Sequence, residues 1–170
     1  DNPYISYINT TSSELKYAYN DGSWHNESIH NCANPGLTSI TLDASGRPYI
    51  GFIDDETLNY IYHDGANWTT QYVADQAANG TIDTFLDSSG TLHFGYYNTT
   101  SEVVYGTYDG TWTSNIGENT NALFAIGAFE SMAMDSSNNP HFCYYNDNED
   151  RFTYAYFDGS WHVEKVDNLD

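Results

Sequence analysis

The chain has very few basic residues, and this shortage excludes several partners. Only four of its 170 residues are Lys or Arg, against 24 Asp or Glu, so the formal net charge is -20. Nucleic acids and anionic lipid surfaces both attract Lys and Arg, and we therefore exclude nucleic acid as a partner. We interpret the acidic excess as solubility combined with the use of Asp in turns. A salt-rich habitat and weak Ca²⁺ binding are the alternatives.

Long apolar runs and cysteine are also scarce. No apolar stretch approaches 18 residues, so we expect no membrane insertion, and no signal peptide opens the sequence. Cys143 takes a strand position held by Gly51 and Gly95 in sister repeats, which predicts a buried free thiol, whereas Cys32 lies in a connection. A bridge between the two is the less favoured alternative, because a lone pair carries no framework signal.

Aromatic residues are abundant instead, with 16 Tyr, 8 Phe and 4 Trp. All four tryptophans belong to one repeated phrase, in which an aromatic run is followed by Asp-Gly and then by Trp. The phrase ends at Trp24, Trp68, Trp112 and Trp161, so successive copies lie 44, 44 and 49 residues apart. A fixed period of this length predicts a repeat architecture.

A second phrase keeps the same period. It consists of a short apolar run, then Asp-x-Ser-Gly or Asp-Ser-Ser-Asn, then a second apolar run, and its aspartates are Asp43, Asp87 and Asp135. The extra residues of the longer third interval fall almost wholly between residues 115 and 129. We place them in a connection, where insertions are tolerated.

The pattern of apolar runs and turn residues in each repeat predicts four short antiparallel strands. First strands are expected at 40–42, 84–86 and 132–134, second strands at 49–53, 93–97 and 141–145, and third strands at 15–19, 58–62, 103–107 and 152–156, while each fourth strand begins at the tryptophan. The Asp-Gly pair before that tryptophan is a strong hairpin signal, because both residues tolerate positive φ. Neither face of the second strand is polar, so both faces of every sheet should be covered.

Sheets covered on both faces, with a period of this length, predict an all-β fold: a β-propeller of four-stranded antiparallel blades. The chain holds about 3.75 repeats of 44–49 residues, with blades at about 1–35, 36–79, 80–127 and 128–170, in one propeller domain or part of one. The first blade is expected to lack its innermost strand. The chain is therefore either part of a larger propeller or a homo-oligomer, and we expect a dimer that completes a ring of about seven or eight blades.

The segments Asp43–Pro48, Tyr17–Trp24 and Tyr154–Trp161 carry a family resemblance. Their patterns, Asp-x-Ser-Gly-x-Pro and Tyr-Ala-Tyr-x-Asp-Gly-x-Trp, resemble the repeats of secreted prokaryotic β-propellers of the sialidase-like, Asp-box-like surface group. The resemblance covers nearly the whole chain and implies the propeller fold. A true Asp box reads Asp-x-Gly-x-Thr-Trp, whereas Asp and Gly are adjacent here, so sialidase activity is not implied.

Candidate binding residues are the repeated tryptophans and the aromatic residue that opens each second strand. Sugar sites combine aromatic faces with polar groups for the hydroxyls, and the similarity to propeller lectins implies sites between blades. The predicted ligand-binding residues are Trp24, Trp68, Trp112, Trp161, Tyr49, His93 and His141. As a structural alternative, each Trp closes a hairpin against the neighbouring blade, and the histidines are aromatic wedges.

Catalytic chemistry has little support in the sequence. Neither a metal-binding histidine spacing nor a Gly-x-Ser-x-Gly nucleophile motif occurs, so we predict no catalytic residues. The alternative is a carbohydrate-active enzyme that uses His93 or His141 with a tyrosine as an acid–base pair.

Two acidic segments interrupt the regular repeat. They contribute Asp54, Asp55 and Glu56, and then Asp147, Glu149 and Asp150, all between second and third strands. Clustered oxygens bind Ca²⁺, so these six residues are the candidate metal ligands, and Ca²⁺ is the one cofactor considered beside none at all.

Taken together, the sequence predicts an extracellular or cell-surface propeller that binds glycan or mediates adhesion without catalysis. Five glycosylation sequons suit that location, at Asn9, Asn26, Asn67, Asn79 and Asn98. The alternatives are a polysaccharide lyase or glycosidase on the same scaffold, and a structural surface-layer segment.

Overall fold

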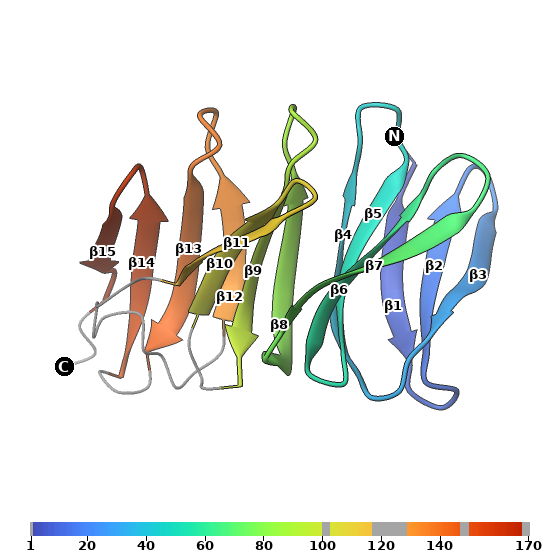
Figure 1. Cartoon of the computed structure of the whole chain (residues 1–170), viewed down its shortest axis with the longest axis horizontal. Helices are drawn as coiled ribbons and strands as arrows, with labels where there is room; N and C mark the ends of the chain where they lie inside the picture. The colour runs from blue at the N-terminus through green and yellow to red at the C-terminus, as the bar shows by residue number, and fades with distance from the viewer. Residues whose placement is uncertain (1, 100–102, 117–128, 147–149, 168–170) are drawn as a thin grey trace.

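The described residues form fifteen β-strands in four antiparallel sheets (Figure 1). The structure is a computed structural model that describes residues 2–99, 103–116, 129–146 and 150–167. No helix occurs in these residues, and therefore none that would cross a membrane. The sheets are the blades of a partial β-propeller, as the sequence predicts.

The blades follow one another along the chain. The first blade has three strands: β1 (Tyr4–Asn9), β2 (Glu14–Asn20) and β3 (Trp24–Asn31). The second consists of β4 (Pro35–Leu42), β5 (Pro48–Asp54), β6 (Thr57–His63) and β7 (Trp68–Asp75). The third consists of β8 (Ala77–Leu86), β9 (Leu92–Asn98), β10 (Val103–Tyr108) and β11 (Trp112–Ile116). The fourth consists of β12 (Phe129–Met134), β13 (Pro140–Asn146), β14 (Arg151–Phe157) and β15 (Trp161–Lys165).

Strand types match the expectation, and most strands extend a residue or two beyond it. In the part of the chain that the structure describes, the first blade has three strands and no innermost one, so β1 corresponds to β5, β9 and β13. The boundary expected at 79/80 lies at Gln76 instead, because β8 begins at Ala77 and continues across a register shift. The boundary expected at 127/128 lies outside the described residues.

The Asp-Gly hairpins differ from the prediction in one detail. Only the glycine has positive φ, as at Gly65 (105°) and Gly110 (110°). In the second blade the Asp64 carboxylate accepts the N–H two residues later, which Ala66 donates over 2.7 Å. The Asp therefore builds the turn through a hydrogen bond rather than through a left-handed backbone.

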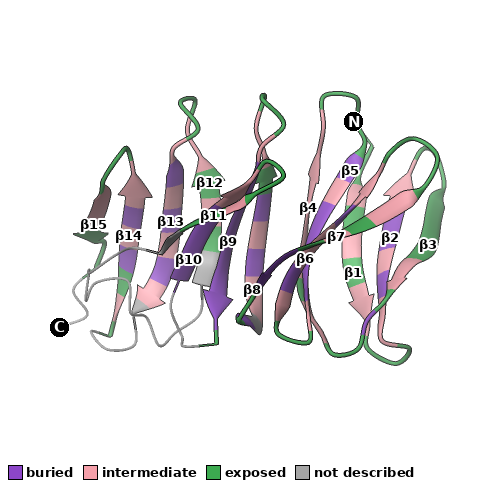
Figure 2. Cartoon of the chain, in the orientation of Figure 1, coloured by how far each residue is buried: buried purple, intermediate pink, exposed green. Residues whose placement is uncertain are grey.

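Neighbouring blades pack face to face. The face of one sheet that carries Leu15 or its equivalents lies against the opposite face of the next sheet. Leu15 and Tyr17 of the first blade meet Phe52 of the second, and the later junctions repeat this arrangement. Figure 2 shows the buried residues concentrated in the middle strands of the blades. This packing confirms that both faces of the inner sheets are covered.

The innermost strands lie against one another along the propeller axis, β4 beside β8 and β8 beside β12. Hydrogen bonds tie them together in one direction. The Ser39 hydroxyl accepts the N–H of Thr84 over 3.0 Å, and the Asp83 carboxylate accepts the N–H of Met132 over 2.6 Å. Burial raises the pKa of Asp83.

Both ends of the blade row carry exposed apolar residues. Ile5 and Trp24 lie on the outer face of the first blade, and Phe152 lies on the fourth. Both cysteines are free, so no bridge joins them, and Cys143 is half-buried. Burial and the Asp54 carboxylate raise the pKa of the Cys32 thiol to about 11, so this thiol stays protonated at neutral pH.

Candidate functional site

The hairpins between first and second strands and between third and fourth strands lie at one rim of the propeller, which is uppermost in Figure 1. Alternating strand directions require this, because a four-stranded meander brings its first and third turns to the same end. The Asp-x-Ser-Gly turns and the Asp-Gly turns therefore share a rim.

Asp-x-Ser-Gly turns are built by their aspartates. Asp87 Oδ1 accepts the N–H groups of Ser89 (2.9 Å) and Thr91 (2.8 Å), and Asp43 and Asp135 make the equivalent pairs of bonds. Burial alone would raise the pKa of Asp87, but hydrogen bonds from its turn and from His93 outweigh that effect and lower the pKa. Recurrence of these aspartates thus has a structural cause.

A pocket of about 590 Å³ opens at this rim between the second and third blades. Asp43, Arg47 and Tyr49 line it from the second blade, and Asp87 and Ser89 line it from the third. Arg47 Nε and Nη2 each lie 2.7 Å from Asp43 Oδ2. These contacts, with a 3.4 Å hydrogen bond from Nη1 to the Asp64 carbonyl, orient the guanidinium beside the Asp43 carboxylate.

Tyr49 belongs to a stack of aromatic rings on the second blade. Its ring lies 5.4 Å from that of Tyr62 at an interplanar angle of 12°, and 6.4 Å from that of Tyr60. Two packed neighbours restrict the ring, so Tyr49 offers the pocket a fixed aromatic surface. Of the seven predicted ligand-binding residues, it is the one that lines this pocket.

His93 and His141 each pair with a tyrosine of the same blade. His93 is only 5% exposed; its Nδ1 lies 2.8 Å from the Tyr105 hydroxyl, and its Nε2 lies 3.4 Å from Asp87 Oδ2. In the fourth blade, His141 Nδ1 lies 2.5 Å from the Tyr154 hydroxyl. The histidine–tyrosine pair imagined for catalysis is therefore present twice.

The phenols of these pairs stay protonated at neutral pH. Burial and the Asp87 carboxylate raise the pKa of Tyr105 to about 12, and desolvation together with Glu164 raises the pKa of Tyr154. A protonated phenol donates to Nδ1, which leaves the Nε2–H of His93 to donate to Asp87. The arrangement orders the blade, while burial closes the His93 pair to substrate.

The tryptophans divide into two groups. The Trp68 ring lies 5.1 Å from that of Tyr17 in the preceding blade, and the Trp161 ring lies 6.2 Å from that of Tyr105. Trp112 packs on Phe94 and belongs to the core between the second and third blades. Within the described residues no blade precedes Trp24, and it is 55% exposed. Three of the four thus close junctions, as the structural alternative anticipated.

The first acidic segment forms a tight hairpin between β5 and β6. Asp55 and Glu56 have positive φ (48° and 60°), and Asp54 accepts the N–H groups of Ala33 (3.1 Å) and Asn34 (2.8 Å). The Asp54 carboxylate thus joins the first blade to the second.

In the second acidic segment, Tyr145 donates to Asp150, whereas Asp147 and Glu149 lie outside the described residues. No three acidic, His or Cys side chains come together in a metal-binding group within the described part of the chain.

Sequence reasoning missed Arg47 and Asp87 as pocket residues. One signal was available for Arg47. It is one of only four basic residues and stands where the sister repeats have Thr91 and Asn139, so it breaks the repeat at the turn. Nothing in the sequence distinguishes Asp87 from the other turn aspartates.

Comparisons with known proteins agree on the fold. No protein-family model matches the chain, and no curated protein matches its sequence. Among solved structures, the chain is similar to the six-bladed fucose-recognising lectin of the fungus Aleuria aurantia (TM-score 0.72, 14% identity), covering 97% of this chain and 57% of that one. It is similar to the SapL1 lectin in complex with α-methyl fucoside (TM-score 0.70, 16% identity), covering 99% and 64%.

A leech intramolecular trans-sialidase is a more distant neighbour (TM-score 0.57, 14% identity), covering 91% of this chain and 30% of that one. The chain spans less than two thirds of the length of each of these proteins. At such identities the likeness establishes the β-propeller fold that lectins and sialidase-like proteins share.

Proposed function

We propose that this chain is a carbohydrate-binding propeller module that holds glycans in the pocket between its second and third blades, without catalysing a reaction. The observation that carries the proposal is the pocket itself, which is lined by the packed ring of Tyr49, by Arg47 and by the turn carboxylates. Its propeller neighbours include lectins described with fucose, which supports a sugar as the ligand.

The chemistry of the pocket suits a neutral or acidic sugar. An apolar sugar face packs on an aromatic ring, while hydroxyls donate to carboxylates and accept from hydroxyl or guanidinium donors. Tyr49 supplies the ring, Asp43 and Asp87 supply acceptors, and Arg47 supplies donors. Most of these groups are already oriented by bonds within the turns, which lowers the entropic cost of binding.

A glycan array tests this proposal directly. We expect wild-type protein to bind a defined subset of glycans and Tyr49→Ala to bind them about tenfold more weakly, because aromatic contacts contribute about 1 kcal/mol beyond area burial. Tyr4→Ala is the matched control, since Tyr4 holds the same repeat position but does not line this pocket. Silence across the array, or equal losses in both variants, would contradict the proposal.

Absence of catalysis and of a metal requirement are parts of the same proposal. The protonated tyrosines beside His93 and His141 support the first, and the Asp54 carboxylate already engaged by two N–H groups supports the second. Incubation with polysaccharides should release no product, and binding should be equal with Ca²⁺ and with a chelator. Product release that His141→Ala abolishes would instead favour a carbohydrate-active enzyme.

We also propose an extracellular or cell-surface location and a ring completed by a second copy. The acidic, sequon-rich sequence supports the location. The ring is supported by the contact between Tyr17 and Trp68, which joins the first blade to the second. Trp24 at one end of the row holds the repeat position of Trp68, and Tyr154 at the other end holds that of Tyr17. The two ends could therefore form the same contact between two copies.

A further inference from the structure

Strand β1 has an unpaired inner edge. In the described residues it pairs with β2 alone, whereas β5, β9 and β13 each pair with an innermost strand as well. The carbonyl of Pro3 accepts the N–H of Asn20 over 3.2 Å. Antiparallel pairing alternates from there, so the main-chain N–H and C=O groups of Tyr4 and Ser6 point away from β2 to the open edge.

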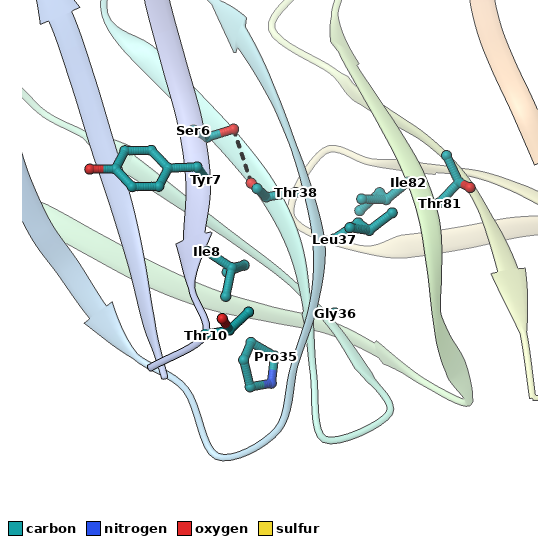
Figure 3. A pocket seen from close by; sticks show the side chains of 10 residues that line it. All are labelled: Ser6, Tyr7, Ile8, Thr10, Pro35, Gly36, Leu37, Thr38, Thr81 and Ile82. Atoms are coloured by element: carbon teal, nitrogen blue, oxygen red, sulfur yellow. Dashed lines mark hydrogen bonds between the residues drawn. The ribbon is translucent and has the colours of Figure 1, made fainter. Parts of the chain in front are cut away.

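A groove of about 520 Å³ lies beside this edge (Figure 3). Its walls are Ser6 and Ile8 of β1, Leu37 and Thr38 of β4, and Ile82 of β8. Figure 3 shows Ser6 and Thr38 joined by a hydrogen bond of 3.0 Å, which ties β1 to β4. Leu37 is 54% exposed, so apolar surface is available next to the free main-chain groups.

The innermost strands supply a second docking feature. Ser39 accepts the N–H of Thr84 in the next blade, and Asp83 accepts that of Met132. Ile40 holds the same repeat position as the donors Thr84 and Met132. Its N–H points away from β5, because the main-chain bonds to that strand come from Ser39 and Thr41. A Ser or Asp in a strand added to β1 would meet this donor.

We propose that the β1 edge is a strand-addition site for an extended segment with the first-strand pattern of this repeat. That pattern is Ser or Asp, two further residues, then Leu or Met followed by Asp, as in Ser39–Asp43, Asp83–Asp87 and Ser131–Asp135. Main-chain bonds to Tyr4 and Ser6 supply the affinity, and the bond to Ile40 with the Leu37 surface supplies the selectivity. The same interface exists within the three four-stranded blades.

Peptides that differ only in backbone methylation test the proposal. The probe is a synthetic peptide with the sequence of residues 37–46, made unmodified, N-methylated at the residues equivalent to Ser39 and Thr41, or N-methylated at those equivalent to Ile40 and Leu42. The first pair of N–H groups faces β1 and the second faces away. We expect the second methylated peptide to bind within about threefold of the unmodified one, and the first at least about tenfold more weakly, because two hydrogen bonds are lost.

Hydrogen exchange gives an independent readout, at a concentration where light scattering shows a monomer. The bound peptide should protect the amides of Tyr4 and Ser6, while those of Tyr49 and Gly51, already paired with β4, serve as the internal reference. Failure to saturate at millimolar peptide, or equal losses for both methylated forms, would overturn the proposal. Protection of Tyr4 and Ser6 by self-association alone, unaffected by peptide, would assign the edge to a second copy and also overturn it.

Discussion

Individual aspartates hold the turns at the rim by accepting hydrogen bonds from main-chain N–H groups. Asp64 accepts two backbone N–H groups, those of Asn67 and Ala66, and these bonds lower its pKa. The backbone N–H of Asn139 lowers the pKa of Asp135, and a hydrogen bond from His162 lowers the pKa of Asp158. A carboxylate whose pKa is lower in the folded state stabilises the fold above its unfolded pKa, and this contribution is lost as the pH falls through the folded value.

Asp87→Asn tests this linkage at a largely buried turn. The variant should have a lower unfolding temperature than the wild type at pH 7, where the wild-type carboxylate is ionised. The difference should shrink as the pH falls below about 4, the ordinary Asp pKa, and close when the wild-type carboxyl is protonated as well. Thermal melts from pH 2 to 7 measure it.

The control for that series is Asp109→Asn, because Asp109 is exposed and accepts one N–H, from Thr111 over 3.2 Å. Its effect should be smaller at every pH. A difference for Asp87→Asn that does not change with pH would show that the lost charge is not what matters.

Residue identities in the site were only partly predictable. Tyr49 could be found because an aromatic recurs at its position, and the structure places it in the pocket. The role of Asp87 could not be found, because its pocket arises from the contact between two blades rather than from local pattern. His93 and His141 share one repeat position, yet their exposure differs, since the third blade is covered by the fourth and the fourth has no neighbour in the described chain.

Strand positions were far more predictable, because each depends on local signals. Short apolar and aromatic runs between Asp-Gly and Asp-x-Ser-Gly turns predict each strand within a few residues, and the fifteen described strands follow them. The start of β8 was less predictable, because nothing in Asp75–Ala77 reads as a strong break. The small residue at Gly51 has a reason that local sequence does not reveal: a side chain there would collide with Thr84 of the next blade.

Trp68 and Trp24 provide a test of how junctions stabilise the blades. Trp68→Ala removes a ring packed against Tyr17 of the preceding blade and should lower the free energy of unfolding by about 3 kcal/mol. Trp24→Ala removes an exposed ring at the same repeat position and should change it by less than about 0.5 kcal/mol. Urea unfolding at low protein concentration measures both. Equal effects would mean that the rings act within their own hairpins rather than across junctions.

At the scale of the molecule, the two end faces determine assembly. If a second copy completes the ring, light scattering should give twice the 19.1 kDa mass of the chain. Trp24 should then pass from water into an aromatic contact, and its fluorescence should shift to shorter wavelength as protein concentration rises.

Trp24→Asp is the matched variant for assembly, because Trp24 is exposed in the single chain and its loss should leave the blades folded. The variant should remain at the mass of one chain. A wild-type protein that stays monomeric at every concentration would contradict the ring shared by two copies. The end faces would then pack against blades other than those of a second copy.

The bonds between innermost strands run one way around the axis, with an acceptor side chain such as Ser39 on one blade and a main-chain donor such as Thr84 on the next. The row of blades therefore has a polarity, and both junctions between innermost strands pair a side-chain acceptor with a main-chain donor. Gain or loss of a whole unit of about 44 residues regenerates a junction of this kind wherever it occurs. Gene duplication or protein design can thus change the length of the row freely, provided that the cut points keep the phase of the repeat.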